Sequence, residues 1–371
     1  MARVIALVGG GTMGPVVPLL ALYKKLAERH PADSFVWVGT PDGPERKAIE
    51  ELNIPFVPIT VAKMPRYFSV KMLTWPFDYL DAAKDAKEFL DKWKPDVVIG
   101  AGGFSQVPVI RAAAKRGIVC AVHQLDFEPL LSNRLVARFC KLVTTSFVYH
   151  RKHLLVPIFR YSLQNRLTEE VTIATPNRFV GAIVPEKSKA AQYFGLDGSL
   201  PTVLFVGGGT GSRLLNEVVE NNLDKWLAKV QILQITGKGR GFDAKERPGY
   251  AKREFIKQDE MLRAYAAADI VVSRGGMGAI ADFAALSKPS IIVPIKNSAQ
   301  EKNVRHMELS VVGVEESANL FEDLYHQICH LFAHPDERLR LAEEIHRALR
   351  TDDGTEWADH IEKLLPENEN G

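Results

Sequence analysis

The chain has 371 residues, of which 46% are hydrophobic and 25% are charged, values typical of a folded globular protein. A single hydrophobic core stops growing at roughly 250 to 300 residues, so this length predicts two domains. Because 47 basic residues are balanced by 45 acidic ones, the net charge excludes a strongly basic nucleic-acid-binding protein.

Cysteine content and hydropathy indicate a soluble protein of the reducing cytoplasm. Cys120, Cys140 and Cys329 have no paired spacing, which argues against a disulfide framework and against a zinc site. The stretch Met1 to Val8 is too short for a signal sequence and is better interpreted as a buried first strand. No run reaches the about 18 apolar residues that a bilayer requires, so any membrane contact is expected to be peripheral.

A near-repeat is the strongest internal pattern. Arg3 to Gly14 reads RVIALVGGGTMG, and Thr202 to Ser212 reads TVLFVGGGTGS. Each is a short apolar run followed by Gly-Gly-Gly-Thr and then by apolar residues at helical spacing, which predicts a strand, a glycine turn and a helix. Further strands are expected at 34–38, 96–100, 119–123, 230–236, 270–273 and 290–294, with helices between them at 79–93 and 259–268.

This alternation predicts an α/β protein with two Rossmann-like, doubly wound parallel sheets facing across a cleft. The expected domains are 1–184 and 185–354, joined at a polar connector, with a C-terminal helix over about 355–371 that can pack back on the first domain. In such sheets ligands bind beyond the carboxyl ends of the strands, where the glycine loops fall.

Glycine loops that lead into helices favour phosphate ligands, because backbone N–H groups and the helix dipole meet there. Gly9, Gly11 and Gly14 match the dinucleotide fingerprint, but the second strand ends at Thr40 without the acidic residue that NAD requires. A dinucleotide enzyme and purely structural turns remain alternatives. In the second domain a loop beginning at Arg274 precedes Asp282, which suits a ribose diol or equally a solvated helix face.

Together, the motifs resemble the MurG family of N-acetylglucosaminyltransferases over nearly the whole chain. In the first domain the matching segments are Gly10 to Pro18 (GGTMGPVVP), Pro95 to Phe104 (PDVVIGAGGF), His123 to Asp126 (HQLD) and Ser132 to Arg134 (SNR). In the second domain they are Val206 to Gly211 with Asn216, Thr236 to Gly239, Phe255 and Ile256, Ala268 and Asp269, Arg274 to Gly276 with Asp282, and Gln300 with Asn303.

The resemblance implies the GT-B fold and an inverting transfer of N-acetylglucosamine from UDP-GlcNAc to a polyprenyl-pyrophosphate-linked sugar, as in lipid II synthesis for peptidoglycan. It implies no cofactor and no metal. The implied acceptor-binding residues are Gly11, Thr12, Gly14, Gly102, Gly103, Phe104 and Asn133. The implied nucleotide-sugar-binding residues are Gly208, Gly209, Thr210, Gly211, Asn216, Gly237, Lys238, Phe255, Ile256, Arg274, Gly275, Gly276, Asp282, Gln300 and Asn303.

The sequence departs from the family pattern mainly in the acceptor loops. Pro15 stands where the family has a histidine, so the expected general bases are His123 and Asp126. A hydrogen-bonded structural histidine and a capping or loop aspartate are the alternatives. No Asp-x-Asp motif is present, so helix N-termini and Arg274 are expected to stabilise the diphosphate.

Two stretches of the first domain lack acidic residues and combine basic with apolar and aromatic side chains. They are 129–168, which includes Arg151, Lys152 and Arg160, and 52–77, which includes Lys63 and Trp75. Such a composition predicts contact with an anionic membrane on the cytoplasmic side, with a partner-protein surface or a partly buried hairpin as alternatives.

Three functional classes therefore stay open. They are a transferase with a lipid-linked acceptor, a nucleotide-sugar enzyme of similar fold with a soluble substrate such as a 2-epimerase, and an inactive binding relative. The acid-free basic stretches favour the first, while Pro15 keeps the third in consideration.

Overall fold

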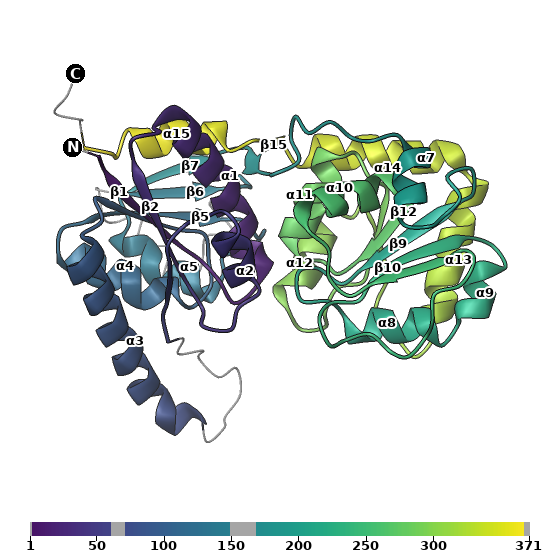
Figure 1. The fold of residues 1–371 in the computed structure, drawn as a ribbon, viewed down its shortest axis with the longest axis horizontal. Helices are drawn as coiled ribbons and strands as arrows, with labels where there is room; N and C mark the ends of the chain where they lie inside the picture. The colour runs from purple at the N-terminus through teal and green to yellow at the C-terminus, as the bar shows by residue number, and fades with distance from the viewer. Residues whose placement is uncertain (1, 61–70, 149–167, 367–371) are drawn as a thin grey trace. The chain divides into compact units, whose positions relative to one another are not determined.

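The computed structural model describes residues 2–60, 71–148 and 168–366, and the chain divides into two compact units (Figure 1). Unit 1 comprises Met1–Arg178 together with Asp352–Gly371, and unit 2 comprises Phe179–Thr351. Each unit is built around its own parallel sheet, which confirms the predicted fold class.

The sheet of unit 1 has the strand order β3-β2-β1-β4-β5-β6-β7, and all neighbouring strands are parallel. Its strands are β1 (Val4–Val8), β2 (Ser34–Gly39), β3 (Phe56–Pro58), β4 (Val97–Gly100), β5 (Val119–Gln124), β6 (Leu142–Thr145) and β7 (Glu169–Thr172). The sheet is covered on both faces, as its continuous apolar strands require. Along β1, for example, Ile5 and Leu7 enter one core cluster while Ala6 and Val8 enter the other.

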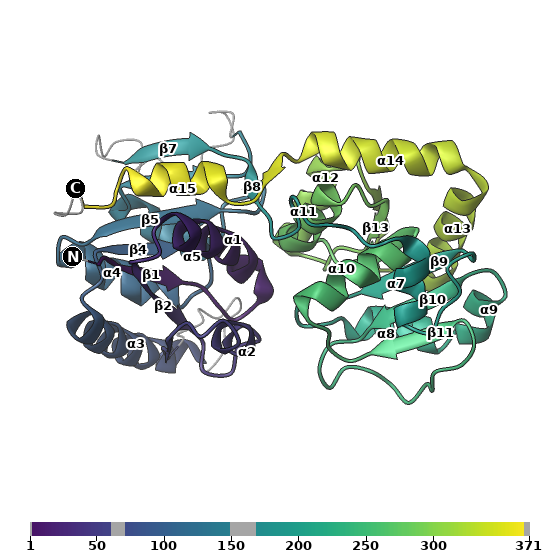
Figure 2. The ribbon, with the colours of Figure 1, turned by 45° about the horizontal axis from the view of Figure 1, so that its top comes forward.

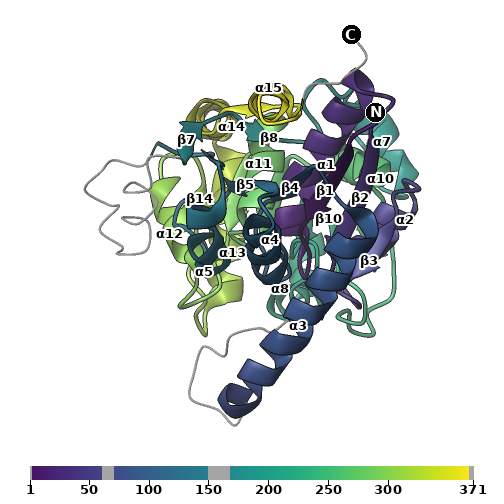
Figure 3. The same ribbon diagram turned by 90° about the vertical axis from the view of Figure 1, so that its left-hand side faces the viewer.

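The helices of unit 1 cover these two faces. They are α1 (Met13–Arg29), α2 (Glu45–Glu50), α3 (Lys71–Trp93), α4 (Gln106–Lys115), α5 (Leu131–Val136), the 3-10 turn η1 (Ala137–Phe139) and α15 (Thr355–Glu362). Helices α1 and α15 pack on one face, and α3 and α4 on the other. The N-terminal end of α3 extends beyond α4 (Figures 1 and 3).

Helix α15 comes from the far end of the chain and lies beside α1 (Figures 1 and 2). Trp357 of α15 is fully buried in the cluster that includes β1 and α1. Arg29 at the end of α1 pairs with Asp359 at 2.7 Å and with Glu362 at 3.1 Å. The chain reaches α15 through β15 (Thr351–Asp352), which pairs with β8 (Thr175–Pro176).

The sheet of unit 2 has the strand order β11-β10-β9-β12-β13-β14 and is also parallel. Its strands are β9 (Thr202–Val206), β10 (Gln231–Ile235), β11 (Tyr250–Arg253), β12 (Ile270–Ser273), β13 (Ser290–Ile292) and β14 (Val312–Gly313). Its helices are α7 (Lys187–Tyr193), α8 (Arg213–Glu220), α9 (Leu223–Leu227), α10 (Gln258–Ala267), α11 (Met277–Ala285), α12 (Ala299–His306), α13 (Leu320–Ala333) and α14 (Pro335–Ala348). Trp226 of α9 is buried in the core beside Phe205 of β9, with ring centroids 5.5 Å apart.

The predicted strands are confirmed to within a few residues, whereas β3, β6, β7, β8, β11, β14 and β15 were not predicted. The helix predicted at 79–93 begins earlier, at Lys71, and the C-terminal helix expected over about 355–371 ends at Glu362. In the described part of the chain, every helix is too short or too polar to cross a bilayer. Much of the predicted membrane contact, including Arg151, Lys152, Arg160 and Lys63, lies outside the described residues.

Candidate active site

The glycine loop of unit 2 lies at the carboxyl end of β9 and leads into α8. Ser212 caps this helix, since its Oγ accepts a hydrogen bond from the Leu215 N–H at 3.4 Å. Gly209 and Thr210 are exposed in the loop, and Gly208 beside them is partly exposed. Unpaired N–H groups at a helix N-terminus favour an anion, so this loop is a suitable place for a phosphate group.

A second loop, after β10, packs directly against the first. A side chain at Gly237, whose φ is +82°, would lie 2.6 Å from the Gly211 Cα, so the close approach of the loops requires glycine. Arg240 donates from Nη1 to the Gly211 carbonyl at 3.3 Å. Buried Asn216 donates to the carbonyl oxygens of Thr236 and Arg240, both at 2.9 Å. Asn216, predicted to bind the nucleotide sugar, thus holds the two loops together.

Arg274 follows β12 and links three strand ends of unit 2. Its Nε donates to the Ser212 Oγ at 2.9 Å, and its Nη1 donates to the Val293 carbonyl at 3.1 Å. The same Nη1 lies 2.5 Å from the Glu316 carboxylate. A guanidinium therefore lies against the cap of α8, and its predicted role in stabilising a diphosphate stays a prediction.

The N-terminal part of α12 holds the loop after Arg274. Gln300 accepts hydrogen bonds on Oε1 from the Gly275 and Ile295 N–H groups, both at 3.1 Å. Asn303, which is fully buried, donates to the Gly275 carbonyl at 3.1 Å. The structure therefore brings Gln300, Asn303 and Gly275 together. The two amide side chains hold the loop after Arg274 in position.

The other predicted nucleotide-binding residues differ in accessibility. Phe255 is 55% exposed just beyond β11, and Ile256 next to it is buried. Lys238 is exposed and Gly276 is partly exposed. Asp282, however, is 3% exposed, and its carboxylate accepts a hydrogen bond from the Tyr265 hydroxyl at 3.3 Å. The carboxylate is therefore largely covered and already accepts from Tyr265, so its ribose role stays a prediction.

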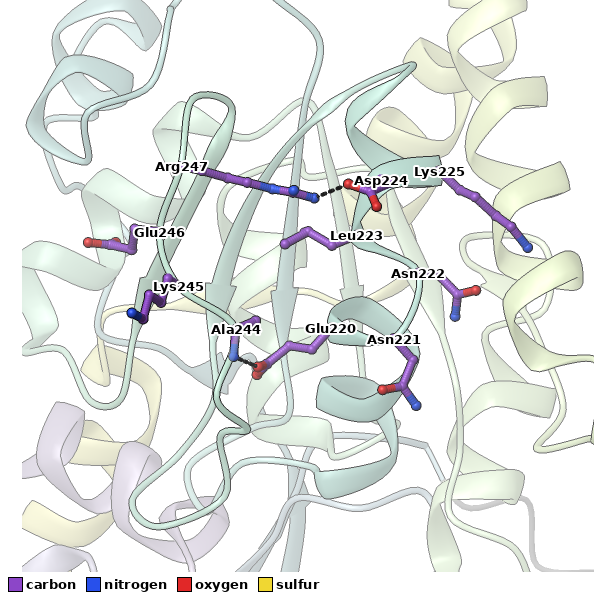
Figure 4. Close-up of a pocket in the computed structure, with 10 residues that line it drawn as sticks. All are labelled: Glu220, Asn221, Asn222, Leu223, Asp224, Lys225, Ala244, Lys245, Glu246 and Arg247. Carbon is purple, nitrogen blue, oxygen red and sulfur yellow. Dashed lines mark hydrogen bonds and ion pairs between the residues drawn. The ribbon is translucent and has the colours of Figure 1, made fainter.

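A separate hollow in unit 2 lies between the α8–α9 connection and the loop before β11 (Figure 4). Glu220 lines it and accepts hydrogen bonds from the Phe242 and Ala244 N–H groups at 3.1 and 3.0 Å. Asp224 pairs across it with Arg247 (Figure 4). None of the predicted site residues lines this hollow. The contacts of Glu220 and Asp224 hold one end of the loop between β10 and β11, and Lys238 and Arg240 lie toward the other end of that loop.

The first glycine loop of unit 1 leads into α1, with Thr12 exposed and with Gly11 and Gly14 partly exposed. A buried carboxylate packs against this glycine loop and binds its backbone. Glu45 of α2 is inaccessible to solvent and accepts hydrogen bonds from the Gly11 N–H at 3.1 Å and the Thr40 N–H at 2.8 Å. The Thr40 hydroxyl donates to the same carboxylate at 2.7 Å. Glu45 thereby fixes the loop to the end of β2.

The loop after β4 meets the first glycine loop and carries Gly102, Gly103 and Phe104. A side chain at Gly103, with φ +82°, would lie 2.7 Å from the Gly10 carbonyl oxygen, so the two loops are in close contact. Gly103 and Phe104 are partly exposed, whereas Gly102 is buried.

A chain of buried amides runs from this loop to Asp126. The Gly102 N–H donates to Gln106 at 3.0 Å, and Gln106 donates to Asn133. Asn133 donates to the Gln124 Oε1 at 2.6 Å, and Gln124 donates in turn to the Asp126 carbonyl at 2.8 Å. Asn133, predicted to bind the acceptor, is 1% exposed, so its position favours support of these loops over direct contact.

Of the two predicted general bases, His123 is completely buried in β5. Its Nδ1 lies 3.0 Å from the Thr144 hydroxyl and its Nε2 lies 3.3 Å from the Ser146 hydroxyl, while its ring packs 4.8 Å from that of Trp357. Burial lowers the pKa of His123 to about 3. This environment favours the alternative of a structural, neutral histidine over the base.

Asp126 follows β5 and is partly exposed. The amide chain described above holds its backbone, so the carboxylate is carried on a fixed loop at the carboxyl end of β5. Of the two candidates, Asp126 is the more exposed, and its role as the general base stays a prediction.

Several residues that shape these loops were not predicted from the sequence, namely Glu45, Gln106, Arg240 and Glu316, because their roles depend on contacts between segments far apart in sequence. Gln124 was matched only as part of the HQLD motif, and Ser212 only as the end of its glycine loop, although a serine directly before a helical pattern is a typical N-cap.

Two parallel α/β units with glycine loops at their strand ends are the architecture of the GT-B fold. The chain is similar to a crystal structure of MurG from Acinetobacter baumannii, with a TM-score of 0.66 and 20% identity over 98% of this chain and 100% of the other. A UDP-GlcNAc 2-epimerase from Neisseria meningitidis bound to UDP-GlcNAc gives a TM-score of 0.65 at 12% identity, again over 98% and 100%. At these identities the likenesses establish the fold.

The sequence comparisons establish the family. Residues 5–145 match the glycosyltransferase family 28 N-terminal domain, and residues 202–355 match the family 28 C-terminal domain. A UDP-N-acetylglucosamine–N-acetylmuramyl-(pentapeptide) pyrophosphoryl-undecaprenol N-acetylglucosamine transferase from Lachnoclostridium phytofermentans is 34% identical over 341 residues, covering 88% of this chain and 90% of the relative. The chain belongs to glycosyltransferase family 28, and the predicted resemblance is confirmed.

Proposed function

We propose that this family 28 glycosyltransferase transfers N-acetylglucosamine, with inversion, from UDP-GlcNAc to a polyprenyl-pyrophosphate-linked sugar, in the manner of lipid I to lipid II conversion in cell-wall synthesis. The name of the relative that is 34% identical supports this donor and this class of acceptor. The acid-free basic stretches support an acceptor held at the inner face of the cell membrane.

One observation carries the donor half of the proposal. The Arg274 guanidinium is hydrogen-bonded to the Ser212 cap of α8, so a cation, a helix N-terminus and an exposed glycine loop converge in unit 2. That combination suits the diphosphate of a nucleotide sugar, whose charge increases when it leaves. The exposed Phe255 offers an aromatic face for the base.

The transfer is a single displacement at the anomeric carbon. An acceptor hydroxyl oxygen forms the new bond to that carbon, the bond from carbon to phosphate oxygen breaks, and UDP leaves with the electron pair. We assign the hydroxyl proton to the Asp126 carboxylate, because His123 is buried and is held neutral. Helix α8 and Arg274 stabilise the leaving diphosphate without requiring a metal.

The test is UDP release from UDP-GlcNAc with a panel of polyprenyl-pyrophosphate-linked sugars, with and without acceptor. We expect release that depends on a lipid-linked acceptor, persists in EDTA, and falls at least about 100-fold in kcat for Asp126→Asn. Acceptor-independent conversion of UDP-GlcNAc would instead indicate a 2-epimerase. Loss of activity in EDTA that magnesium or manganese restores would refute the metal-free mechanism.

A further inference from the structure

The proposed diphosphate site contains an acidic side chain that the transfer reaction does not require. Glu316 lies in the loop between β14 and α13, and its carboxylate is 2.5 Å from the Arg274 Nη1. The two side chains are 23% and 11% exposed, so the ion pair is largely shielded from solvent. Arg274 is the residue that also bonds the Ser212 cap of α8.

The loop that carries Glu316 is held in place by its own hydrogen bonds. The Ser317 hydroxyl donates to Asp323 of α13 at 3.1 Å, and the Asn319 N–H donates to the Ser317 Oγ at 3.1 Å. The Arg274 guanidinium is fixed from the other side by the Val293 carbonyl. Glu316 is therefore a fixed negative charge beside the cation that would face the diphosphate.

We propose that Glu316 is a specificity-determining residue that competes with the diphosphate for Arg274 and so weakens binding of the UDP product more than binding of the UDP-sugar donor. The inference rests on the proposed function, because it places the diphosphate at α8 and Arg274. UDP ends in a free terminal phosphoryl group whose second ionisation has a pKa of about 6, whereas in a UDP-sugar the sugar blocks that ionisation, so near neutral pH UDP carries nearly one negative charge more. A fixed carboxylate repels that additional charge and favours product release.

Calorimetric titration of the full chain with UDP, UDP-GlcNAc and uridine tests this charge effect. Glu316→Gln keeps an oxygen that can accept from Arg274 but removes the charge. We expect this variant to bind UDP about tenfold more tightly and UDP-GlcNAc less than about fivefold more tightly, with uridine unchanged. The gain in UDP affinity should shrink at high salt.

Glu315 provides a matched control. It is the adjacent residue and is exposed, so Glu315→Gln removes the same charge from the same loop. This control should bind UDP as the wild type does. Glu316→Ala, which removes the hydrogen bond as well as the charge, should also bind UDP more tightly if charge is the cause.

The outcomes separate this inference from the function on which it rests. If the wild type binds neither UDP nor UDP-GlcNAc, the proposed function fails and the inference fails with it. If the wild type binds both and Glu316→Gln leaves the ratio of the two affinities unchanged, the inference alone is refuted. Weaker UDP binding by Glu316→Gln would refute it too, since Glu316 would then be orienting Arg274 for the ligand.

Discussion

Replacement of Glu45 by alanine should destabilise unit 1 and release its first glycine loop. The carboxylate is inaccessible to solvent and accepts hydrogen bonds from the N–H groups of Gly11 and Thr40 and from the Thr40 hydroxyl. In Glu45→Ala the buried Thr40 N–H and the partly buried Gly11 N–H lose this acceptor, while the Thr40 hydroxyl can rotate to another partner.

The magnitude follows from these contacts. Each buried N–H group left without an acceptor costs about 1–3 kcal/mol, and the lost side-chain volume adds a cavity. We therefore expect Glu45→Ala to lower the free energy of unfolding of unit 1 by about 3–6 kcal/mol. Glu45→Gln keeps the shape but places an amide NH2 toward one of the donors, so its expected cost is about 1.5–3 kcal/mol.

Urea-dependent hydrogen exchange measured by mass spectrometry suits a chain of two units, because each peptide reports on its own unit. A peptide that spans Val4 to Gly14 follows unit 1, and one that spans Thr202 to Ser212 is the internal control in unit 2. The control variant is Glu50→Ala in the same helix, whose side chain is 53% exposed and pairs with Arg46 at 2.8 Å. Such a surface pair contributes at most about 1 kcal/mol.

The reasoning about Glu45 would be refuted by a Glu45→Ala variant whose unit 1 unfolds within about 1 kcal/mol of the wild type. Equal losses for Glu45→Ala and Glu50→Ala would also contradict it, because they would show that helix α2, and not the buried carboxylate, determines the effect.

Three further predictions concern charge. The unfolded state of His123 takes up a proton below about pH 6.5, but the folded state does so only near about pH 3. Unit 1 should therefore lose stability as the pH falls through this window, by at most about 1.4 kcal/mol per pH unit from this residue. Denaturant titrations at several pH values should show a shallower slope for His123→Gln, and identical slopes would contradict the buried neutral histidine. Asp282→Ala should weaken UDP binding about tenfold in calorimetry if the carboxylate holds the ribose diol, and unchanged affinity would assign it to its Tyr265 contact alone. The triple change of Arg151, Lys152 and Arg160 to Glu should abolish most sedimentation with anionic vesicles, because each basic side chain near such a surface contributes about 1 kcal/mol. If the triple variant sediments as the wild type does, the segment 151–166 is not the anchor.

The sequence allowed the fold to be predicted because its signals are local. Apolar runs followed by glycine loops mark β1 and β9, and the carboxyl ends of parallel strands lie at one edge of a sheet. The strands that were missed are short, and two of them carry weak patterns. β7 reads EEVT at the edge of its sheet, and β14 consists of Val312 and Gly313. Edge strands of this kind lack the apolar signature of central ones.

The glycine loops of the candidate site could be predicted from the sequence, but the side chains that hold these loops in place could not. Glu45 reads as one of several charged residues on a short helix, and its contact with Gly11 appears only when α2 packs under the loop. His123 could not be assigned from sequence, because its burial depends on Trp357 from the other end of the chain. Asn133 and Asn216 follow the family motifs, yet their amides are directed to neighbouring loops.

The C-terminal helix has a consequence for synthesis of the protein. Unit 2 is one continuous segment, whereas the core of unit 1 includes Trp357, which the ribosome makes only after all of unit 2. During translation, the apolar face of the unit 1 sheet that α15 covers stays exposed until all of unit 2 has been made. A chain that stops before α15 would keep that surface exposed permanently, so shortened chains should aggregate through unit 1 although every predicted site residue is present.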